Sequence, residues 1–522
     1  GWQYVEHRLV LWAARQLGRP VKWTCERSEA PLADEHGRDC VGEIELALDE
    51  NHHFIALRVN VFNNIGAYVG SDRNLLVPSM MIGTSAGVYL IPVAYASVIG
   101  VLSNTSPIAP YRGAGRPEAI YLIERLIDDV ARELNVDRLE LRRRNMVRAQ
   151  VMPCDNPLGC HYDSGDFPAS LERALKAADY DGFPARRKAS ALVGKLRGIG
   201  IINAIEQAAT PSQSEFAELR FDSSGTINLP IGTKAQGRGH ETTLKQILHE
   251  KLVVDPSEVH FIDGDTDQVA FGMGTTGSRS TVSGGSAILL AAEKIISKGK
   301  LIAAHLLESD AGDVEFSDGK FTIVGTDRSV PLKQVAVAAF QPQRLPPGFD
   351  GGLYESATYA PSKDTYPNGS HICELEVDPE SGEVQLLNYV VVDDVGTVIN
   401  PLTLKGQIHG GVAQGVGQVL MESVLYDRDS GQLLTATFMD YAMPRADLFC
   451  PMTVESSPSP TKLNPLGAKG AGEAGTVGAL PVIVNAVLHA LEPLGVRELE
   501  MPLTRVRISQ AIREAGAART VS

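Results

Sequence analysis

Strand-like runs paired by turn residues, alternating with long helical patterns, constrain the fold of this chain more than any other feature. Turn residues separate apolar runs at four places after residue 196, as hairpins require: 222–225, 317–319, 379–382 and 427–431. Long helical patterns alternate with these pairs at residues 284–308, 402–422 and 481–494. Hairpins mixed with long helices predict an α+β fold of mixed sheets, and not a doubly wound parallel sheet.

In the first third of the chain, apolar residues recur at helical spacing over residues 5–17, and Gly18 ends that pattern. Other patterns predict strands at 21–26, 42–48 and 53–62, and helices from about 117, at 137–145 and at 168–178. Residues 181–195 are rich in charge and lack periodicity, which is typical of a connector. We therefore expect a first domain at residues 1–180, the connector at 181–195 and a second domain at 196–522.

The charge balance and the cysteines exclude several classes of protein. The 522 residues carry 48 Lys and Arg against 63 Asp and Glu, a formal charge of −15, so we expect neither a nucleic acid nor an anionic membrane surface as partner. No stretch approaches the roughly 20 apolar residues of a membrane span. The six cysteines form no C-x-x-C pair, which disfavours iron–sulfur and structural zinc sites and is typical of a cytoplasmic protein with reduced thiols.

Glycine is abundant and clustered. Its 50 residues exceed the usual ~7%, and the excess falls in four loops between strand and helix patterns: 111–117, 232–241, 272–280 and 467–475. Glycine lets backbone N–H groups approach a ligand closely, and a helix that begins at such a loop favours anions. Four such loops predict a large anionic cofactor that is held from several sides.

These loops match no common nucleotide motif. No G-x-x-x-x-G-K-[ST] P-loop occurs, and no G-x-G-x-x-G opens a βαβ unit with an acidic residue downstream. A nicotinamide cofactor is therefore disfavoured, and a nucleotide-binding transferase stays a weaker alternative. Residues 264–267 lack the spacing and the closing Glu of a calcium loop and are interpreted as a strand end.

Five segments, in order along nearly the whole chain, resemble motifs of the molybdenum hydroxylases, the family of xanthine dehydrogenases and aldehyde oxidases. The segments are Tyr111-Arg112-Gly113, residues 232–242 as a G-T-x-x-x-G-Q-G-H-E-T-like loop, residues 277–280, residues 394–415 and residues 470–475. The resemblance is to the molybdenum-binding large subunit, without its N-terminal domain.

The resemblance implies two molybdopterin-binding domains and a molybdopterin cytosine dinucleotide cofactor. The pterin dithiolene, rather than any side chain, would hold the molybdenum. Electrons would leave to an iron–sulfur subunit and an FAD subunit. Because family members carry roughly one more domain before this point, which ends in a glycine-rich loop, Gly1 is expected to be the last residue of that loop, and an N-terminal fragment or sister chain is expected to complete the subunit.

Glu473 and Arg112 are the residues that the resemblance makes catalytic. Glu473 would be the base that takes a proton as oxygen attacks an electron-poor carbon; the plainer alternative is a cap of the helix that follows. Arg112 would orient substrate and stabilise charge at the mouth of the site; its plainer alternative is a surface ion pair.

The resemblance assigns a further set of residues to the cofactor, through backbone, hydroxyl, amide and guanidinium groups. They are Gln236, Gly237, Arg238, Gly239, Gly277, Ser278, Arg279, Ser280, Gln407 and Gly472. Gln407 would hydrogen-bond a cofactor oxygen, although amides in such loops also cap helices. His240 and His409 belong to no paired-histidine metal motif and are interpreted as structural.

Three positions depart from patterns within the family. Arg238 stands where the loop usually has Gln, and would pair with a phosphate or the pterin edge, or disturb the site. Ala114 stands where purine-oxidising relatives place a stacking aromatic ring, which argues against a xanthine-like substrate. Gly113 stands where carbon-monoxide-oxidising relatives place a copper-binding cysteine, which argues against carbon monoxide.

The resulting hypothesis is a hydroxylase that oxidises an aldehyde or an N-heteroaromatic compound, with water as the oxygen source. The alternative is a catalytically inactive scaffold subunit that retains the cofactor pocket.

Overall fold

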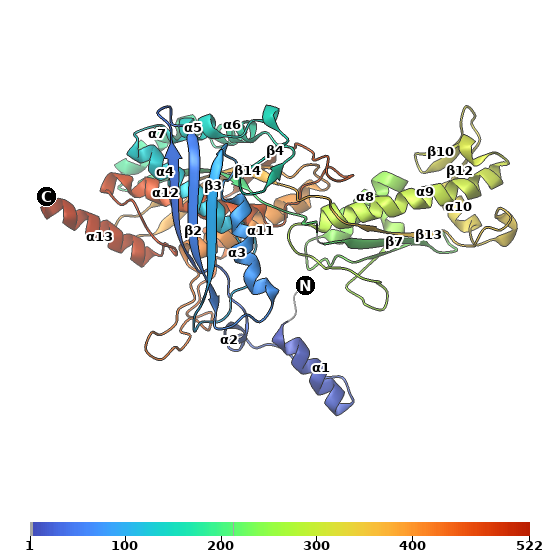
Figure 1. Ribbon diagram of the computed structural model, residues 1–522, viewed down its shortest axis with the longest axis horizontal. Helices are drawn as coiled ribbons and strands as arrows, with labels where there is room; N and C mark the ends of the chain where they lie inside the picture. Colours follow the sequence, from blue (N-terminus) through green and yellow to red (C-terminus); the bar gives the residue numbers. More distant parts are fainter. Residues whose placement is uncertain (1–3, 212, 522) are drawn as a thin grey trace.

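The computed structural model describes residues 4–211 and 213–521 and consists of two lobes, each with its own hydrophobic core (Figure 1). The core of the larger lobe draws on residues between 54 and 205 and between 366 and 508. The core of the smaller, elongated lobe draws on residues between 217 and 357. Both lobes combine sheets and helices, so the α+β prediction is confirmed.

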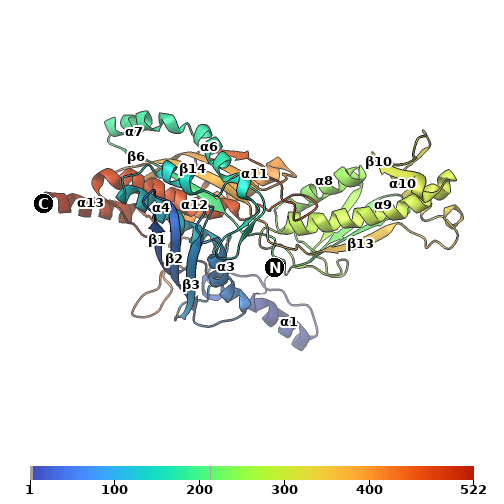
Figure 2. The same cartoon turned by 45° about the horizontal axis from the view of Figure 1, so that its top comes forward.

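The larger lobe is layered (Figure 2). A four-stranded sheet in the order β16-β15-β14-β6 lies between α6 and α7 on one side and α12 with α11 on the other; beyond them α4 packs against a sheet in the order β1-β2-β3. The strands are β1 (Cys40–Leu48), β2 (Phe54–Gly66), β3 (Val93–Leu102), β4 (Cys154–Asp155), β5 (His161–Tyr162), β6 (Leu196–Ile205), β14 (Asn368–Val377), β15 (Val384–Asp394) and β16 (Met452–Ser456). Strands β6, β14 and β15 pair antiparallel, whereas β16 joins β15, and β3 joins β2, in parallel.

The helices of the larger lobe include several that the sequence predicted. They are α1 (Val5–Leu17), α2 (Ala30–Ala33), α3 (Leu76–Thr84), α4 (Arg116–Glu133), α5 (Arg138–Asn145), α6 (Phe167–Ala177), α7 (Phe183–Leu192), α11 (Pro401–Leu420), α12 (Ala474–Leu491) and α13 (Arg505–Val521). The strand predicted at 21–26 does not form. Helix α7 occupies most of the predicted connector 181–195. The hydrophobic cores group the chain differently from the predicted domains, because residues after 366 return to the first lobe. Gly1 lies outside the described residues.

Helix α12 is the central element of the larger lobe. Glycines on its neighbours allow it to approach closely: a Cβ at Gly200 of β6 would lie 1.9 Å from the Val482 carbonyl oxygen. By length and mean hydropathy (1.7), residues 474–494 could cross a membrane, but 94% of that window is buried inside the protein. The sequence prediction that no apolar stretch of this length occurs was therefore wrong, and the stretch forms a core helix.

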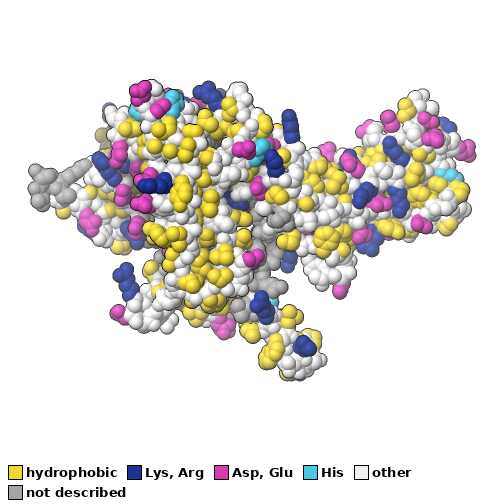
Figure 3. Space-filling model, viewed as in Figure 1, with side chains coloured by type: hydrophobic (Ala, Val, Ile, Leu, Met, Phe, Trp, Pro, Cys, Tyr) yellow, Lys and Arg dark blue, Asp and Glu magenta, His cyan; other side chains and the backbone are white. Residues whose placement is uncertain are grey.

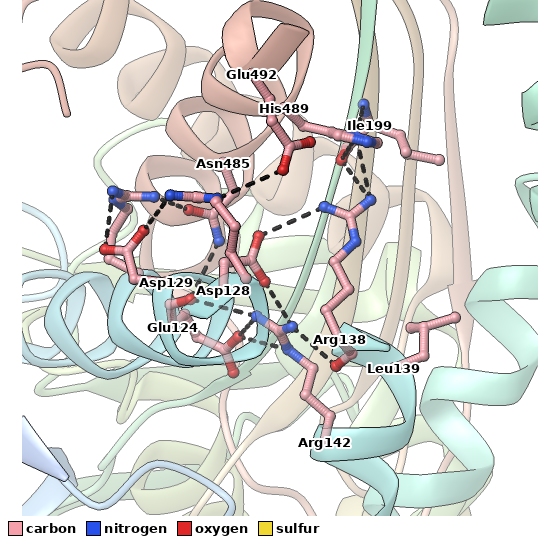
Figure 4. A network of polar contacts seen from close by, with 12 residues as sticks. Glu124, Asp128, Asp129, Arg138, Leu139, Arg142, Ile199, Asn485, His489 and Glu492 are labelled. Atoms are coloured by element: carbon pink, nitrogen blue, oxygen red, sulfur yellow. Dashed lines mark hydrogen bonds and ion pairs between the residues drawn. The ribbon is translucent and has the colours of Figure 1, made fainter. Parts of the chain in front are cut away.

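Buried ion pairs join α5 to α4, and hydrogen bonds attach α12 to both helices (Figure 4). Arg142 of α5 is fully buried and donates to Glu124 at 2.7 Å and to Asp128 at 2.7 Å, both on α4. Asn485 of α12 donates to the Glu124 backbone carbonyl at 3.2 Å. Further along α12, the imidazole nitrogens of His489 lie 3.3 Å from an Arg138 guanidinium nitrogen and 3.0 Å from one of Arg187.

The smaller lobe is a four-stranded sheet, in the order β13-β7-β8-β9, on which α8 and α9 pack (Figure 2). Its elements are β7 (Glu215–Phe221), β8 (Ile227–Ile231), α8 (His240–Leu252), β9 (Val259–Asp263), α9 (Gly285–Leu307), β10 (Val314–Ser317), β11 (Lys320–Ile323), β12 (Ser329–Pro331), α10 (Leu332–Ala338) and β13 (Tyr354–Tyr359). The hairpin turns predicted at 222–225 and 317–319 are confirmed.

Hydrophobic side chains gather on the exposed face over β1, β2 and β3 (Figure 3). Val41, Phe62 and Ile99 lie in register across the three strands and are 74%, 54% and 50% exposed.

Candidate cofactor site

A cavity of about 510 Å³ lies where the glycine-rich loops of both lobes meet. Residues from five segments line it: 110–112, 238–243, 275–281, 395–414 and 468–473. This volume is within the range of sites that enclose a drug-sized ligand or cofactor. The four glycine-rich loops that are far apart in the sequence therefore converge on one space.

Several helices begin at this cavity. The N-cap residues of α8, α11 and α12 are Gly239, Asn400 and Glu473, and the turn at Ser280–Gly284 leads directly into α9. His240, Asn400, Ser280 and Glu473 all line the cavity. Because the N-terminal end of each helix carries a partial positive charge and free N–H groups, the convergence favours a ligand with several anionic groups.

Glycines at the wall leave room that a side chain would fill. A Cβ at Gly277 or at Gly406 would meet no atom within 4 Å, although both residues line the cavity. Where the 467–475 loop meets the 272–280 loop the packing is tight, since a Cβ at Gly470 would lie 2.3 Å from the Ser278 carbonyl oxygen. The space thus fits a large group that lies flat against backbone.

Glu473 lines the cavity at the N-cap of α12, yet its side chain makes no capping hydrogen bond. Its Oε2 atom is buried without a hydrogen-bond partner in the described chain. The charge of Glu473 opposes the lowering of the pKa of both Arg112 and Arg238, for which burial is the main cause. The carboxylate therefore lies in the field of two guanidinium groups, and helix capping does not account for it.

Arg112 ties three segments together at the wall of the cavity. Its Nε donates to the Gly472 carbonyl at 2.6 Å, one terminal nitrogen donates to the Gln414 side chain at 3.0 Å, and the other donates to the Gln407 carbonyl at 3.1 Å. Among the described residues Arg112 has no ion-pair partner on the surface, and it holds the Glu473 loop against α11. Gln407 accepts from Arg112 through Oε1, which leaves its amide N–H groups for a ligand.

The other predicted cofactor residues divide into two groups. Arg238, Gly277, Ser278, Ser280, Gln407 and Gly472 line the cavity, whereas Gln236, Gly237, Gly239 and Arg279 do not. Arg279 requires a correction, because its guanidinium points into the protein, where it donates to Glu215 at 2.6 Å and to the Gly274 carbonyl at 3.0 Å. With both terminal nitrogens engaged there, the buried Arg279 supports the loop and is not available to a cofactor.

Arg238 and His240 lie at the cavity on the side of the smaller lobe. The Arg238 side chain forms no hydrogen bond or ion pair with the residues that the structure describes, so the guanidinium donors are free for an anionic ligand. Burial, followed by the charge of Arg238, lowers the pKa of His240 to about 4. His240 is therefore neutral at pH 7.

The sequence analysis missed Glu206, which follows β6 and is 1% exposed. The Ser278 hydroxyl donates to it at 2.6 Å. A signal existed: Glu206 is the single charged residue in the largely apolar run 199–209. Among the described residues, no group of three or more His, Cys, Asp and Glu side chains has an arrangement that could hold a metal ion.

Family comparisons agree with this geometry. Two models described as molybdopterin cofactor-binding domains match residues 2–146 and 173–449. The chain thus belongs to the molybdopterin cofactor-binding domain family, together with the molybdenum-binding subunits of xanthine dehydrogenases.

Individual relatives extend over nearly the whole chain. It is 36% identical, over 95% of its length, to the carbon monoxide dehydrogenase large chain of Hydrogenophaga pseudoflava, and 32% identical, over 98%, to the nicotine 6-hydroxylase large subunit of Paenarthrobacter nicotinovorans. The solved structure of quinoline 2-oxidoreductase from Pseudomonas putida 86 matches 98% of this chain with a TM-score of 0.92 at 34% identity, and 66% of that chain is covered. The chain spans 64% of the length of both curated relatives.

Proposed function

We propose that this chain is the catalytic part of a molybdenum hydroxylase that oxidises an N-heteroaromatic compound or an aldehyde. The observation that carries the proposal is the position of Glu473. Its carboxylate makes no helix-capping hydrogen bond and lies at the wall of a cavity toward which several helix N-termini point. The relatives that hydroxylate nicotine and oxidise quinoline support the substrate class.

The cofactor in this proposal is molybdopterin cytosine dinucleotide. The N-termini of α8, α11 and α12 and the free Arg238 guanidinium would bind its anionic groups. The Gln407 amide and the backbone near Gly277 would hydrogen-bond its polar edges. When bound, the molybdenum cofactor supplies the oxygen transfer and accepts the two electrons of the oxidation.

The residues of this chain would position groups and move a proton. Glu473 would accept the proton that is released as the new carbon–oxygen bond forms. Arg112 would hold the Glu473 loop against α11 through its bond to the Gly472 carbonyl. Electrons would then pass to an iron–sulfur subunit and an FAD subunit, and a further chain segment would complete the large subunit. The relatives named as large chains and large subunits support such an assembly.

Carbon monoxide is the less favoured substrate, because Gly113 gives no thiol for copper. Gly113 has φ +104°, and a Cβ there would lie 2.3 Å from Cγ of Pro117. A cysteine at this position would be strained and crowded.

The test is Glu473→Gln in the purified complex, assayed with a dye acceptor and with aldehyde and N-heteroaromatic substrates. We expect kcat to fall by about 10²- to 10⁴-fold, with molybdenum and released cytidine nucleotide unchanged. Glu492→Gln, at the far end of the same helix, is the matched control and should keep wild-type turnover. Wild-type turnover in Glu473→Gln would exclude Glu473 as the base, and a molybdenum-loaded wild type without turnover would favour the scaffold alternative.

A further inference from the structure

Glu206 is a buried carboxyl group that the proposed reaction does not yet use. It follows β6 and lies behind the 277–280 loop, where it is 1% exposed. A charge in this position is costly unless it is paired, because the protein interior solvates ions poorly. No ion pair to Glu206 forms within the described chain, so its partner must be of another kind.

That partner is Glu473. The Glu473 carboxyl group lies within hydrogen-bonding reach of Glu206, and the Oε2 atoms of both residues are buried without a hydrogen-bond partner in the described chain. Two carboxylates cannot make such a bond, since each offers only acceptors. A single proton between them satisfies both orphaned oxygen atoms and removes the repulsion between like charges.

The surroundings decide which residue holds the proton. Burial, followed by the negative charge of Glu473, raises the pKa of Glu206 well above its usual range; the Ser278 hydroxyl and Arg116 oppose this only in part. Glu473 instead faces two cations, Arg112 and Arg238. Glu206 is therefore the neutral acid of the pair.

Ser278 fixes Glu206 in place from the other side. Its hydroxyl occupies Oε1 of Glu206 at 2.6 Å. Ser278 has φ +50°, a left-handed conformation that a non-glycine residue adopts only where its surroundings hold it. Gly470 and Gly472 pack against Ser278, so the loop that presents Glu473 also fixes the residue that orients Glu206.

We propose that Glu206 is a positioning residue, whose carboxyl O–H donates to one oxygen of Glu473 and directs the other oxygen toward the reacting centre. This role rests on the proposed function, in which Glu473 is the catalytic base. One proton is held between the two groups, and no electron moves. Ionisation of Glu206 at high pH would place a second negative charge beside Glu473 and break the bond, so activity should decline on an alkaline limb.

The experiment compares Glu206→Gln and Glu206→Ala in the purified complex. The Gln side chain keeps the volume and an N–H donor but cannot ionise, so it should retain kcat within about 3-fold and lose the alkaline limb of the kcat–pH profile. Glu206→Ala loses the donor and should reduce kcat by about 10- to 100-fold, as expected for a hydrogen bond to a charged group, with KM little changed. Wild-type kcat in Glu206→Ala, or an unchanged alkaline limb in Glu206→Gln, would overturn the proposal.

A second readout does not depend on turnover. Infrared spectra of the resting protein should contain the carbonyl band of a buried protonated carboxyl group, which Glu206→Gln removes. If that band persists in Glu206→Gln, the assignment of the proton to Glu206 is wrong, whatever the activity. If the band vanishes but the wild type oxidises none of the substrates, the pair stands and the proposed function fails.

Discussion

Replacing Arg279 by methionine is expected to destabilise the smaller lobe by about 3–5 kcal/mol, because it leaves the buried Glu215 carboxylate without its counter-ion. Arg279 and Glu215 are 1% and 0% exposed, and their ion pair is 2.6 Å long. The guanidinium also donates to the carbonyls of Ser214 at 2.9 Å and Gln213 at 3.2 Å. The substitution therefore removes the counter-ion and leaves buried carbonyls without their donor.

Native-state hydrogen exchange of the β7 amides measures this change where it occurs. A loss of about 3–5 kcal/mol corresponds to exchange that is faster by about 10²- to 10³-fold or more. Lys333→Met, which breaks an exposed ion pair with Glu258 in the same lobe, is the matched control. The side chains of Lys333 and Glu258 are 55% and 39% exposed. That change should cost about 0–1 kcal/mol.

Two further results separate the charge from mere packing. The double variant Arg279→Met with Glu215→Leu should recover most of the loss, since an apolar pair carries no desolvation cost. Burial raises the pKa of Glu215 even with Arg279 present. In Arg279→Met, stability should therefore be best preserved at low pH and lost as the pH rises through the raised pKa. A loss below about 1 kcal/mol in the single variant, or a double variant no better than the single one, would refute the reasoning.

Two other predictions concern the larger lobe and the cavity. Burial, followed by the charges of Arg138 and Arg187, lowers the pKa of His489 to about 3. Unfolding therefore takes up a proton below pH ~6.5. The thermal midpoint should fall as the pH drops from there toward 3. His489→Gln should weaken this dependence of the thermal midpoint on pH. An unchanged dependence in the variant would show that His489 is not its source. Gly406→Phe should fill the open space beside Gly406 and remove most of the bound molybdenum and nucleotide. The thermal midpoint of the cofactor-free protein should stay within a few degrees of the wild-type value. Full cofactor content in this variant would show that the cofactor binds elsewhere.

Local sequence patterns predicted the helices near residues 5–17, 116–133, 285–307 and 401–420, because a 3.6-residue apolar period follows directly from helix geometry. The start of α12 at Ala474 was missed. Gly475, Gly478 and Pro481 make this segment resemble a loop in sequence. The glycines are needed for packing: a Cβ at Gly478 would lie 2.5 Å from the His371 ring. The strand predicted at 21–26 is absent, since no described strand lies beside it to complete a ladder.

The sequence by itself determined the mixture of hairpins and long helices and the glycine-rich loops, and the resemblance of its motifs to those of the molybdenum hydroxylases selected Glu473 and Arg112 as candidates. Each of these depends on residues close together in the chain. Only the tertiary structure decided that Arg279 turns inward to Glu215, that Arg112 fastens α11 to the Glu473 loop, and that Glu206 lies close to Glu473. Those contacts join segments tens to hundreds of residues apart, and packing and the cost of burying charge select them, which no local pattern encodes.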